Sequence, residues 1–273
     1  MATGAHGTVR IADGVELEVV SYGAGEPVAV IQTALTGDEL LPFTELLAQG
    51  TGLRAIHVAR RGYGTVSGPG KPTTTIADMA ADCRDVIEAL GVVPSHVVGA
   101  SFSCAVALAS AVLAPSHVRS LTLVEPPPLD GPGAEQFRAA TAGLIATATA
   151  RGTAAALDEF MPQLYGQPWR EAPELAGSDV AALERDAETF FAIDLPALLA
   201  WRADPTVLAG VHCPVMVVGG AESGAWFREA QELLVQWLPR AEQVTVAGAG
   251  HLLAGTHPRE LAGLTAEFVG RHR

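Results

Sequence analysis

Runs typical of buried strands alternate with runs typical of amphipathic helices in both the first half and the last quarter of this sequence. The expected strands cover residues 14–20, 27–31, 53–59, 96–99, 118–124, 215–218 and 243–246. The expected helices cover residues 36–49, 75–90, 102–113, 226–238 and 258–271, the first opened by a Thr36-x-x-Glu39 capping box. Because strands that alternate with helices form a parallel sheet covered on both faces, we predict an α/β fold with a mostly parallel central sheet.

The alternation is interrupted over residues 127–205. Three consecutive prolines at 126–128 mark the exit from a strand, and the segment that follows is rich in alanine and helical in pattern. From residue 157 its apolar side chains recur at i, i+3, i+4 and i+7. Since ligands of α/β folds bind beyond the C-terminal ends of the strands, we predict that residues 127–205 form a helical cap there. Residues 1–126 and 206–273 would then be the two parts of one core domain.

The charge balance of the chain is acidic, with 17 Lys and Arg against 30 Asp and Glu and a net charge of −13. This charge repels phosphate groups, so we expect neither nucleic acid nor a membrane surface as a partner. The N-terminal residues lack a secretory signal pattern, and no run reaches the roughly 18 apolar residues of a membrane span. The three cysteines lie too far apart for a Cys-x-x-Cys pair. We therefore expect a cytoplasmic protein with free thiols.

A serine stands at the junction of an expected strand and an expected helix, in the segment Gly99-Ala100-Ser101-Phe102-Ser103. Small residues on both sides let the strand and the helix approach closely, and the sharp turn presents the serine hydroxyl at the end of the sheet. Backbone N–H groups at the helix N-terminus would stabilise negative charge that develops there. The placement predicts that Ser101 is a nucleophile; the alternative is a structural turn serine.

His251 is the best placed of the eight histidines to act as a base. A serine hydroxyl is a poor nucleophile until a base removes its proton. His251 follows the expected strand 243–246 and the flexible residues 247–250, so it lies on a loop at the end of the sheet. It also comes late in the chain, consistent with the order serine, acid, histidine. We predict that His251 activates Ser101.

Two glutamates are candidates for the acid that orients His251. Glu222 follows the expected strand 215–218, and Glu125 directly follows the expected strand 118–124. Either carboxylate would hold the imidazole and stabilise its charged form. Glu222 matches the commoner arrangement, so we predict Glu222 and keep Glu125 as the alternative.

With these residues in place, the chain resembles the α/β-hydrolase superfamily over nearly its full length, in the capped subgroup of esterases, lactonases and carbon–carbon bond hydrolases. The sequence Arg-Gly-Tyr-Gly at 61–64 resembles the family's Arg-Gly-x-Gly turn, and Gly-Ala-Gly-His at 248–251 resembles its histidine loop. The resemblance implies an α/β-hydrolase fold with a helical cap insertion. It also implies an oxyanion hole formed by the backbone N–H groups of Ala34 and Phe102.

The sequence departs from the family pattern at the predicted oxyanion hole. Gln32-Thr33 stand where the family usually has His-Gly, so a residue that tolerates unusual backbone angles is missing. The side-chain amide of Gln32 is an alternative donor. The aspartate common before the Arg-Gly turn is also absent, and Arg60 stands there. Some zearalenone-type lactone hydrolases resemble this chain in having glutamate at the position of Glu125.

These observations predict a serine hydrolase that cleaves an apolar ester or lactone through an acyl-enzyme intermediate. Gln32, Leu164 and Trp226 are expected to contact the substrate. The alternatives are a ligand-binding protein without hydrolytic activity, and a cyclase or acyltransferase that uses the same Ser-His pair. We expect no metal or other cofactor, and no partner beyond a small apolar substrate and, at most, a second copy in a homodimer.

Overall fold

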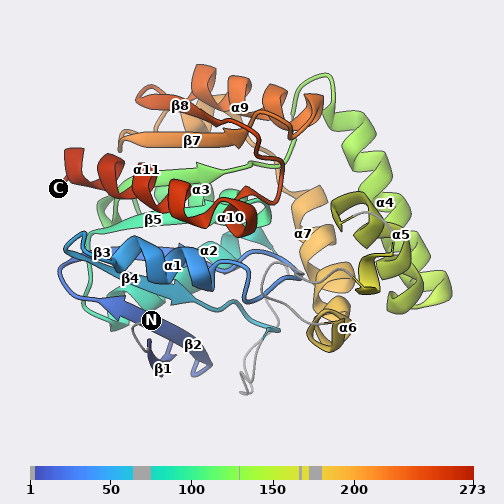
Figure 1. Ribbon diagram of the computed structural model, residues 1–273, viewed down its shortest axis with the longest axis horizontal. Helices are drawn as coiled ribbons and strands as arrows, with labels where there is room; N and C mark the ends of the chain where they lie inside the picture. Colours follow the sequence, from blue (N-terminus) through green and yellow to red (C-terminus); the bar gives the residue numbers. More distant parts are fainter. Residues whose placement is uncertain (1–3, 64–74, 129, 166–167, 172–179) are drawn as a thin grey trace.

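The computed structural model describes residues 4–63, 75–128, 130–165, 168–171 and 180–273 of the chain. Gly64, the last residue of the predicted Arg-Gly-x-Gly turn, lies outside these residues. The architecture is a central sheet with helices on both faces and a further group of helices beyond one end of the strands (Figure 1).

The sheet has eight strands in the order β1-β2-β4-β3-β5-β6-β7-β8. The strands are β1 (Ala5–Arg10), β2 (Glu16–Gly23), β3 (Glu26–Ile31), β4 (Leu53–Val58), β5 (Ser95–Ala100), β6 (Val118–Val124), β7 (Val215–Gly220) and β8 (Ala241–Val246). Strands β3 to β8 pair in parallel, whereas β2 runs antiparallel to both β1 and β4. The predicted mostly parallel sheet is confirmed.

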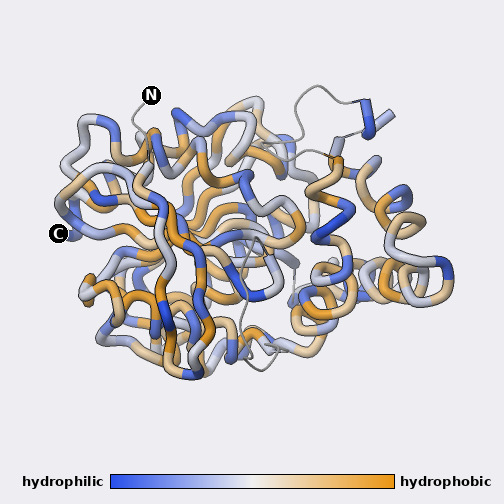
Figure 2. The backbone as a smooth tube through the Cα atoms, turned by 90° about the horizontal axis from the view of Figure 1, so that it is seen from below, coloured by the Kyte–Doolittle hydropathy of each residue, from blue (hydrophilic) through white to orange (hydrophobic). Residues whose placement is uncertain are grey.

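Two sets of helices bury the two faces of the sheet. The first set is α1 (Leu41–Ala48), the short α10 (Leu253–Thr256) and α11 (Pro258–Arg271), which share one hydrophobic cluster with the sheet. The second set is α2 (Ile76–Ala89), α3 (Phe102–Leu113), the short α8 (Pro205–Leu208) and α9 (Ala225–Trp237), which share another. Apolar residues concentrate along the strands between these layers, as expected for strands buried on both faces (Figure 2).

A separate helical layer, defined here as α4 to α7, lies between β6 and β7 in the sequence. It comprises α4 (Ala134–Arg151), α5 (Thr153–Tyr165), α6 (Val180–Thr189), a π-helix (Phe190–Asp194) and α7 (Leu195–Ala200), with one 3₁₀ turn at Trp169–Glu171. These helices have a hydrophobic cluster of their own and lie beyond the C-terminal ends of the strands (Figure 1). Another 3₁₀ turn, Pro115–His117, joins α3 to β6. The division of the chain at 127 and 205 stays a prediction.

Strand β1 and helix α1 differ clearly from the sequence-based expectation. Strand β1 was not expected, because it is an edge strand in which only Val9 is buried and no alternating apolar pattern marks it. Helix α1 begins at Leu41 and not at Thr36, so the predicted capping box is wrong. The Thr36 hydroxyl donates to the Glu39 carboxylate instead of capping a helix N–H group.

The cysteines agree with the expectation of free thiols. Cys83, Cys104 and Cys213 are all free, the first two buried and the third partly buried. Burial raises the pKa of the Cys83 thiol to about 12 and that of Cys213 to about 11, so both are in the unreactive thiol form at neutral pH. Within the described ranges, no helix has the length and apolar character that a membrane span requires.

Candidate active site

The turn between β5 and α3 has the strained geometry predicted for a nucleophile. Ser101 has φ 48° and ψ −118°, outside the regions that non-glycine residues ordinarily adopt. A side chain at Gly99 would collide with the backbone of Ser103, since a Cβ there would lie 2.4 Å from the Ser103 carbonyl oxygen. The Ser103 hydroxyl accepts from the Ala100 N–H at 2.8 Å and lies 3.0 Å from the Ile31 carbonyl oxygen. A serine is therefore accommodated at position 103, where the family pattern has glycine, because its hydroxyl forms hydrogen bonds within the turn.

Ser101 and His251 meet at the C-terminal edge of the sheet. The distance between Ser101 Oγ and His251 Nε2 is 3.1 Å, which is within hydrogen-bond range. The ring of Phe227, from α9, stacks on the imidazole with centroids 4.1 Å apart. The apolar ring of Phe227 therefore helps to hold the imidazole in place, in addition to the contact at Nε2.

The structure pairs His251 with Glu125, the alternative acid. His251 Nδ1 lies 3.2 Å from Glu125 Oε2. The other carboxylate oxygen, Oε1, accepts from the Gly220 N–H at 2.6 Å and from the Ser223 hydroxyl at 2.7 Å. Glu125 is only 1% exposed. These three contacts orient the carboxylate toward the imidazole and fix the tautomer in which Nε2 can accept the serine proton.

Glu222, the acid preferred from the sequence, is not in contact with His251. Its side chain is exposed in the loop after β7, and no hydrogen bond or ion pair joins it to another described residue. Its backbone N–H donates to the Ala249 carbonyl, which fixes this loop beside the histidine loop. Glu125 follows β6, the immediate neighbour of β5 in the sheet, and therefore lies closer to Ser101. The assignment of Glu222 is corrected on this geometry.

Backbone strain gathers at this site. Among the described residues, the non-glycine residues with positive φ are Leu35 (65°), Ser101 (48°) and Glu125 (53°). Such conformations cost about 1–3 kcal/mol each and persist where the surrounding structure enforces them, commonly at functional sites. All three residues line the same cavity. The strain is an independent sign that Glu125 belongs with Ser101.

The two backbone N–H groups expected to form the oxyanion hole are available. Phe102 begins α3, so its N–H has no partner within the helix. In the described part of the chain, the Ala34 N–H also donates to no acceptor, and both residues line the cavity. The unusual backbone angle is taken by Leu35, one residue further along. A glycine at position 33 is therefore not required for this loop conformation.

Gln32 does not lie where the sequence-based prediction put it. Its side-chain Oε1 accepts from the Arg60 N–H at 2.7 Å, and the residue is buried away from the cavity. The predictions that Gln32 contacts the substrate and that it supplies an amide to the oxyanion are therefore corrected. Its role in the structure is to join the end of β3 to the end of β4.

A cavity of about 560 Å³ opens above Ser101, between the sheet and the helical layer. This volume suits a small organic ligand. Its walls are largely apolar and include Phe137, Leu144, Phe160, Leu164, Phe190 and Trp226. Leu164 and Trp226, which were predicted to contact the substrate, thus line the cavity.

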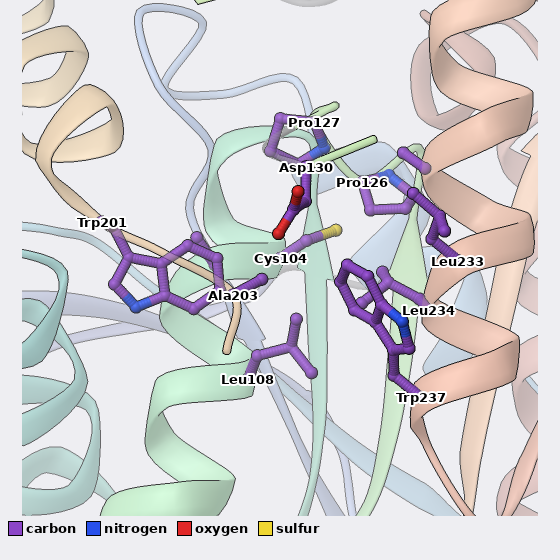
Figure 3. A pocket seen from close by; sticks show the side chains of 12 residues that line it. Cys104, Leu108, Pro126, Pro127, Asp130, Trp201, Ala203, Leu233, Leu234 and Trp237 are labelled. Atoms are coloured by element: carbon purple, nitrogen blue, oxygen red, sulfur yellow. The ribbon is translucent and has the colours of Figure 1, made fainter. Parts of the chain in front are cut away.

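A second pocket is too small to compete with this cavity. It lies between α3 and α9, with Cys104 and Trp237 among its apolar side chains (Figure 3). Its volume is about 20 Å³, and a single water molecule already needs roughly 10–15 Å³. The main cavity is therefore the candidate active site.

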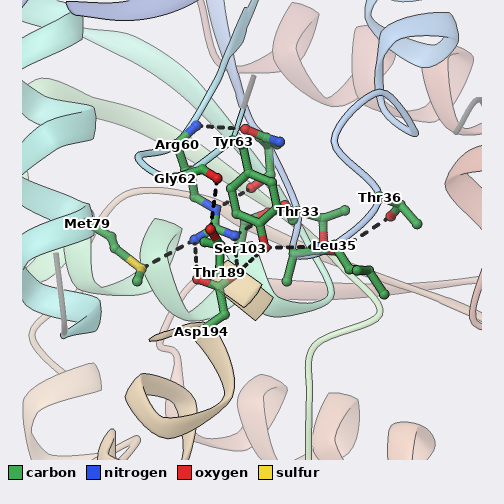
Figure 4. Close-up of polar contacts among 12 residues, drawn as sticks. Thr33, Leu35, Thr36, Arg60, Gly62, Tyr63, Met79, Ser103, Thr189 and Asp194 are labelled. Atoms are coloured by element: carbon green, nitrogen blue, oxygen red, sulfur yellow. Dashed lines mark hydrogen bonds and ion pairs between the residues drawn. The ribbon is translucent and has the colours of Figure 1, made fainter. Parts of the chain in front are cut away.

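A buried ion pair joins the helical layer to the core beneath the site (Figure 4). The Arg60 guanidinium donates to both carboxylate oxygens of Asp194, at 2.9 and 2.6 Å. The Tyr63 hydroxyl donates to Asp194 at 2.5 Å and accepts from the Leu35 N–H at 2.9 Å. Burial raises the pKa of Tyr63 well above its ordinary value, so this hydroxyl keeps its proton. The π-helix that ends at Asp194 is thereby tied to strained Leu35.

Arg60 also holds the residues that precede Ala34. Its Nε donates to the Gln32 carbonyl at 2.9 Å, and its Nη2 donates to the Thr33 carbonyl at 3.3 Å. The guanidinium lies over the ring of Phe102, with its carbon 4.4 Å from the ring centroid. One buried cation therefore contacts the residues that lead into Ala34 and the side chain of Phe102.

Asp194→Ala is expected to lower the free energy of unfolding by about 3–5 kcal/mol, because it leaves the buried charge of Arg60 without its partner. The matched control is Asp13→Ala, which removes an exposed partner of Arg61 and is expected to cost less than about 1 kcal/mol. Chemical denaturation of both variants measures the difference. Equal costs for the two variants would mean that the buried pair contributes no more than a surface ion pair.

The sequence of the chain matches a known protein family. Residues 34–264 match the model of a family described as the alpha/beta hydrolase family. The match covers well over half of the 273 residues and contains Ser101, Glu125 and His251. The chain belongs to the alpha/beta hydrolase family.

Solved structures of the same fold include several hydrolases. An esterase from Thermogutta terrifontis is 20% identical with a TM-score of 0.74, covering 98% of this chain and 100% of its own. An enol-lactonase from Burkholderia xenovorans is 18% identical with a TM-score of 0.77, and the match covers 97% of this chain and 100% of the lactonase chain. An alpha/beta hydrolase from Sphaerobacter thermophilus is 24% identical with a TM-score of 0.73, and the match covers 96% of this chain and 100% of the other chain. At these identities the likeness establishes the fold.

Several residues of the site were not predicted from the sequence. Arg60 stood beside the Arg-Gly turn, and its unusual position there was a signal that a charged residue had replaced an aspartate. Asp194 lies in a segment with no motif, and its pairing with Arg60 spans 134 positions. Glu39 is expected in a helix cap but lines the cavity, as does Phe227, for which the sequence predicts no role.

Proposed function

We propose that this chain is a serine hydrolase that cleaves neutral, largely apolar esters or lactones through an acyl-enzyme intermediate. The observation that carries the proposal is the continuous series of hydrogen bonds from Ser101 through His251 to Glu125 at the base of the cavity. A protein that only bound a ligand would have no use for a strained serine with an oriented base.

The reaction follows from the positions of these groups. Ser101 Oγ attacks the carbonyl carbon while His251 Nε2 takes the hydroxyl proton. Glu125 accepts from Nδ1–H and stabilises the imidazolium that forms. The N–H groups of Ala34 and Phe102 hold the negative oxygen of the tetrahedral intermediate.

The intermediate collapses when His251 returns the proton to the alcohol oxygen, which breaks the ester bond and leaves an acyl group on Ser101. A water molecule then attacks the acyl carbon and gives its proton to the same imidazole. The second collapse releases the carboxylic acid and restores the Ser101 hydroxyl.

The lining of the cavity supports neutral substrates. The acidic side chains that line it are those of Glu39, Glu125 and Glu222, and no Lys or Arg is among its described lining residues. A substrate carboxylate would meet like charge without a compensating cation, which is unfavourable. The aromatic and aliphatic walls favour an apolar body.

Turnover of matched esters tests this proposal. We expect hydrolysis of a neutral aryl ester and of an apolar lactone, with the free acid as the product identified by mass spectrometry. The same aryl ester bearing a carboxylate on its acyl chain is expected to react at least about tenfold more slowly. If the main product in the presence of an added alcohol were a new ester and not the free acid, the enzyme would be an acyltransferase and the proposal of hydrolysis would be wrong.

A further inference from the structure

Glu39 is a buried carboxylate in the cavity that the reaction above does not use. It is 7% exposed and lies just before α1, opposite the apolar walls of the helical layer. The Thr36 hydroxyl donates to its Oε2 at 2.5 Å. Its Oε1 accepts no hydrogen bond from any described residue. One carboxylate oxygen is therefore held by the protein and the other is free to accept from a ligand.

Glu39 has no structural ion pair to explain its burial. No Lys or Arg among the described residues forms a salt bridge with it. Burial raises the pKa of Glu39, while the Thr36 hydrogen bond and the nearby charge of His251 lower it. Burial of a carboxylate without a Lys or Arg partner is costly, and such groups are retained mainly where they serve a function.

A second polar group lies near Glu39 without a partner. The Tyr165 hydroxyl, at the end of α5, is buried and forms no hydrogen bond within the described ranges. Burial, together with the charge of Glu39, raises the pKa of Tyr165. The Tyr165 hydroxyl and Glu39 Oε1 are therefore both without a hydrogen-bond partner among the described residues.

We propose that Glu39 forms a polar subsite that binds a hydrogen-bond-donating substituent of the substrate, a protonated amine or a hydroxyl, at a distance from the bond that is cleaved. This inference rests on the proposed function and deepens it. Glu39 Oε1 accepts from the substituent, and Thr36 positions the carboxylate. The substrate class is therefore an apolar ester or lactone with one donor group, and not a plain hydrocarbon ester.

The charge of the cavity favours the amine. A protonated amine would offset the buried negative charge of Glu39, and its hydrogen bond would be charge-assisted. No Lys or Arg among the described lining residues would repel it. A hydroxyl would donate the same hydrogen bond without the added attraction of opposite charges. A phosphate or carboxylate substituent would be repelled.

A series of p-nitrophenyl esters of increasing acyl chain length tests the subsite, each length made with a methyl, a hydroxyl or an amine at the chain end. At the best length we expect the amine-ended ester to exceed the methyl-ended ester in kcat/KM by about tenfold or more. The hydroxyl-ended ester should fall between them. In Glu39→Met we expect no preference for the amine-ended or the hydroxyl-ended ester over the methyl-ended ester. In Glu39→Gln we expect the preference for the amine-ended ester to fall more than the preference for the hydroxyl-ended ester.

Glu45→Gln is the matched control, since Glu45 lies on α1 outside the cavity and, among the described residues, its carboxylate accepts only from Gln49. This variant is expected to keep the wild-type order of the three ester series. Labelling of Ser101 by a fluorophosphonate in each variant shows whether its site is intact. A wild-type protein without preference for donor-ended chains at any length overturns the inference, as does a preference that survives in Glu39→Met.

Binding to Ser101→Ala separates this inference from the proposed function. This variant cannot form an acyl-enzyme, so calorimetry with amine-ended and methyl-ended esters reads the subsite alone. We expect the amine-ended ester to bind about tenfold more tightly. If this difference is present and the wild-type protein hydrolyses neither ester, the proposed function fails and the subsite stands. If the wild-type protein hydrolyses both esters and the difference is absent, the subsite fails alone.

Discussion

Glu125→Gln is expected to lower kcat for a neutral aryl ester by about 10⁴-fold while leaving the fold intact. A glutamine amide can donate to His251 Nδ1, which favours the tautomer that carries its proton on Nε2. In that tautomer the imidazole cannot accept the Ser101 proton. Steady-state kinetics with a saturating ester measures the loss.

Glu222→Gln is the matched control for this prediction. Glu222 lines the same cavity, but its exposed side chain makes no contact with His251. Its replacement is expected to change kcat by less than about twofold, as for a solvated surface charge. If Glu222→Gln caused the larger loss, the histidine loop would have to adopt another arrangement during the reaction, and the assignment of Glu125 as the acid would be wrong.

Ser101→Ala is expected to reduce kcat by roughly 10⁴–10⁶-fold, since it removes the hydroxyl that His251 Nε2 contacts. His251→Ala should cause a loss of similar size, because the serine hydroxyl loses its base. The double variant is expected to be no slower than the single variants, as residues that act as a unit have non-additive effects. The residual rate would come from the oxyanion donors and from binding alone.

Sensitive kinetics with purified variants measures these losses, and unfolding curves show whether the proteins remain folded. Ser101→Cys offers a further control that keeps a nucleophile in the same place. A Ser101→Ala protein that retained wild-type activity would end the proposed mechanism, because the reaction would then proceed without the serine.

The fold could be predicted where local patterns and tertiary structure agree. Helices α3 and α11 and strand β6 begin and end at the predicted residues, because buried apolar runs and helical spacing mark them clearly. Strand β1 could not be predicted in this way, since an exposed edge strand has no apolar face to reveal it. Helix α1 was started too early because a capping-box sequence also fits a hydrogen bond between two side chains.

The site could be predicted only in part. The strand-serine-helix segment locates Ser101, and the loop after the last strand locates His251. Two strands end next to a glutamate, and their order in the sheet, which local patterns do not determine, decides which glutamate reaches the histidine. The same holds for Asp194, whose role depends on a long-range contact with Arg60.

The central claim is that Ser101 is an activated nucleophile, and the most direct test is its reaction with a fluorophosphonate probe. The modified residue is located by mass spectrometry of the digested protein. We predict labelling at Ser101 in the wild-type protein and none in Ser101→Ala or His251→Ala. A folded wild-type protein that reacts with neither the probe nor a smaller sulfonyl fluoride, yet binds an apolar ligand, would contradict the account and would identify a binding protein without hydrolytic activity.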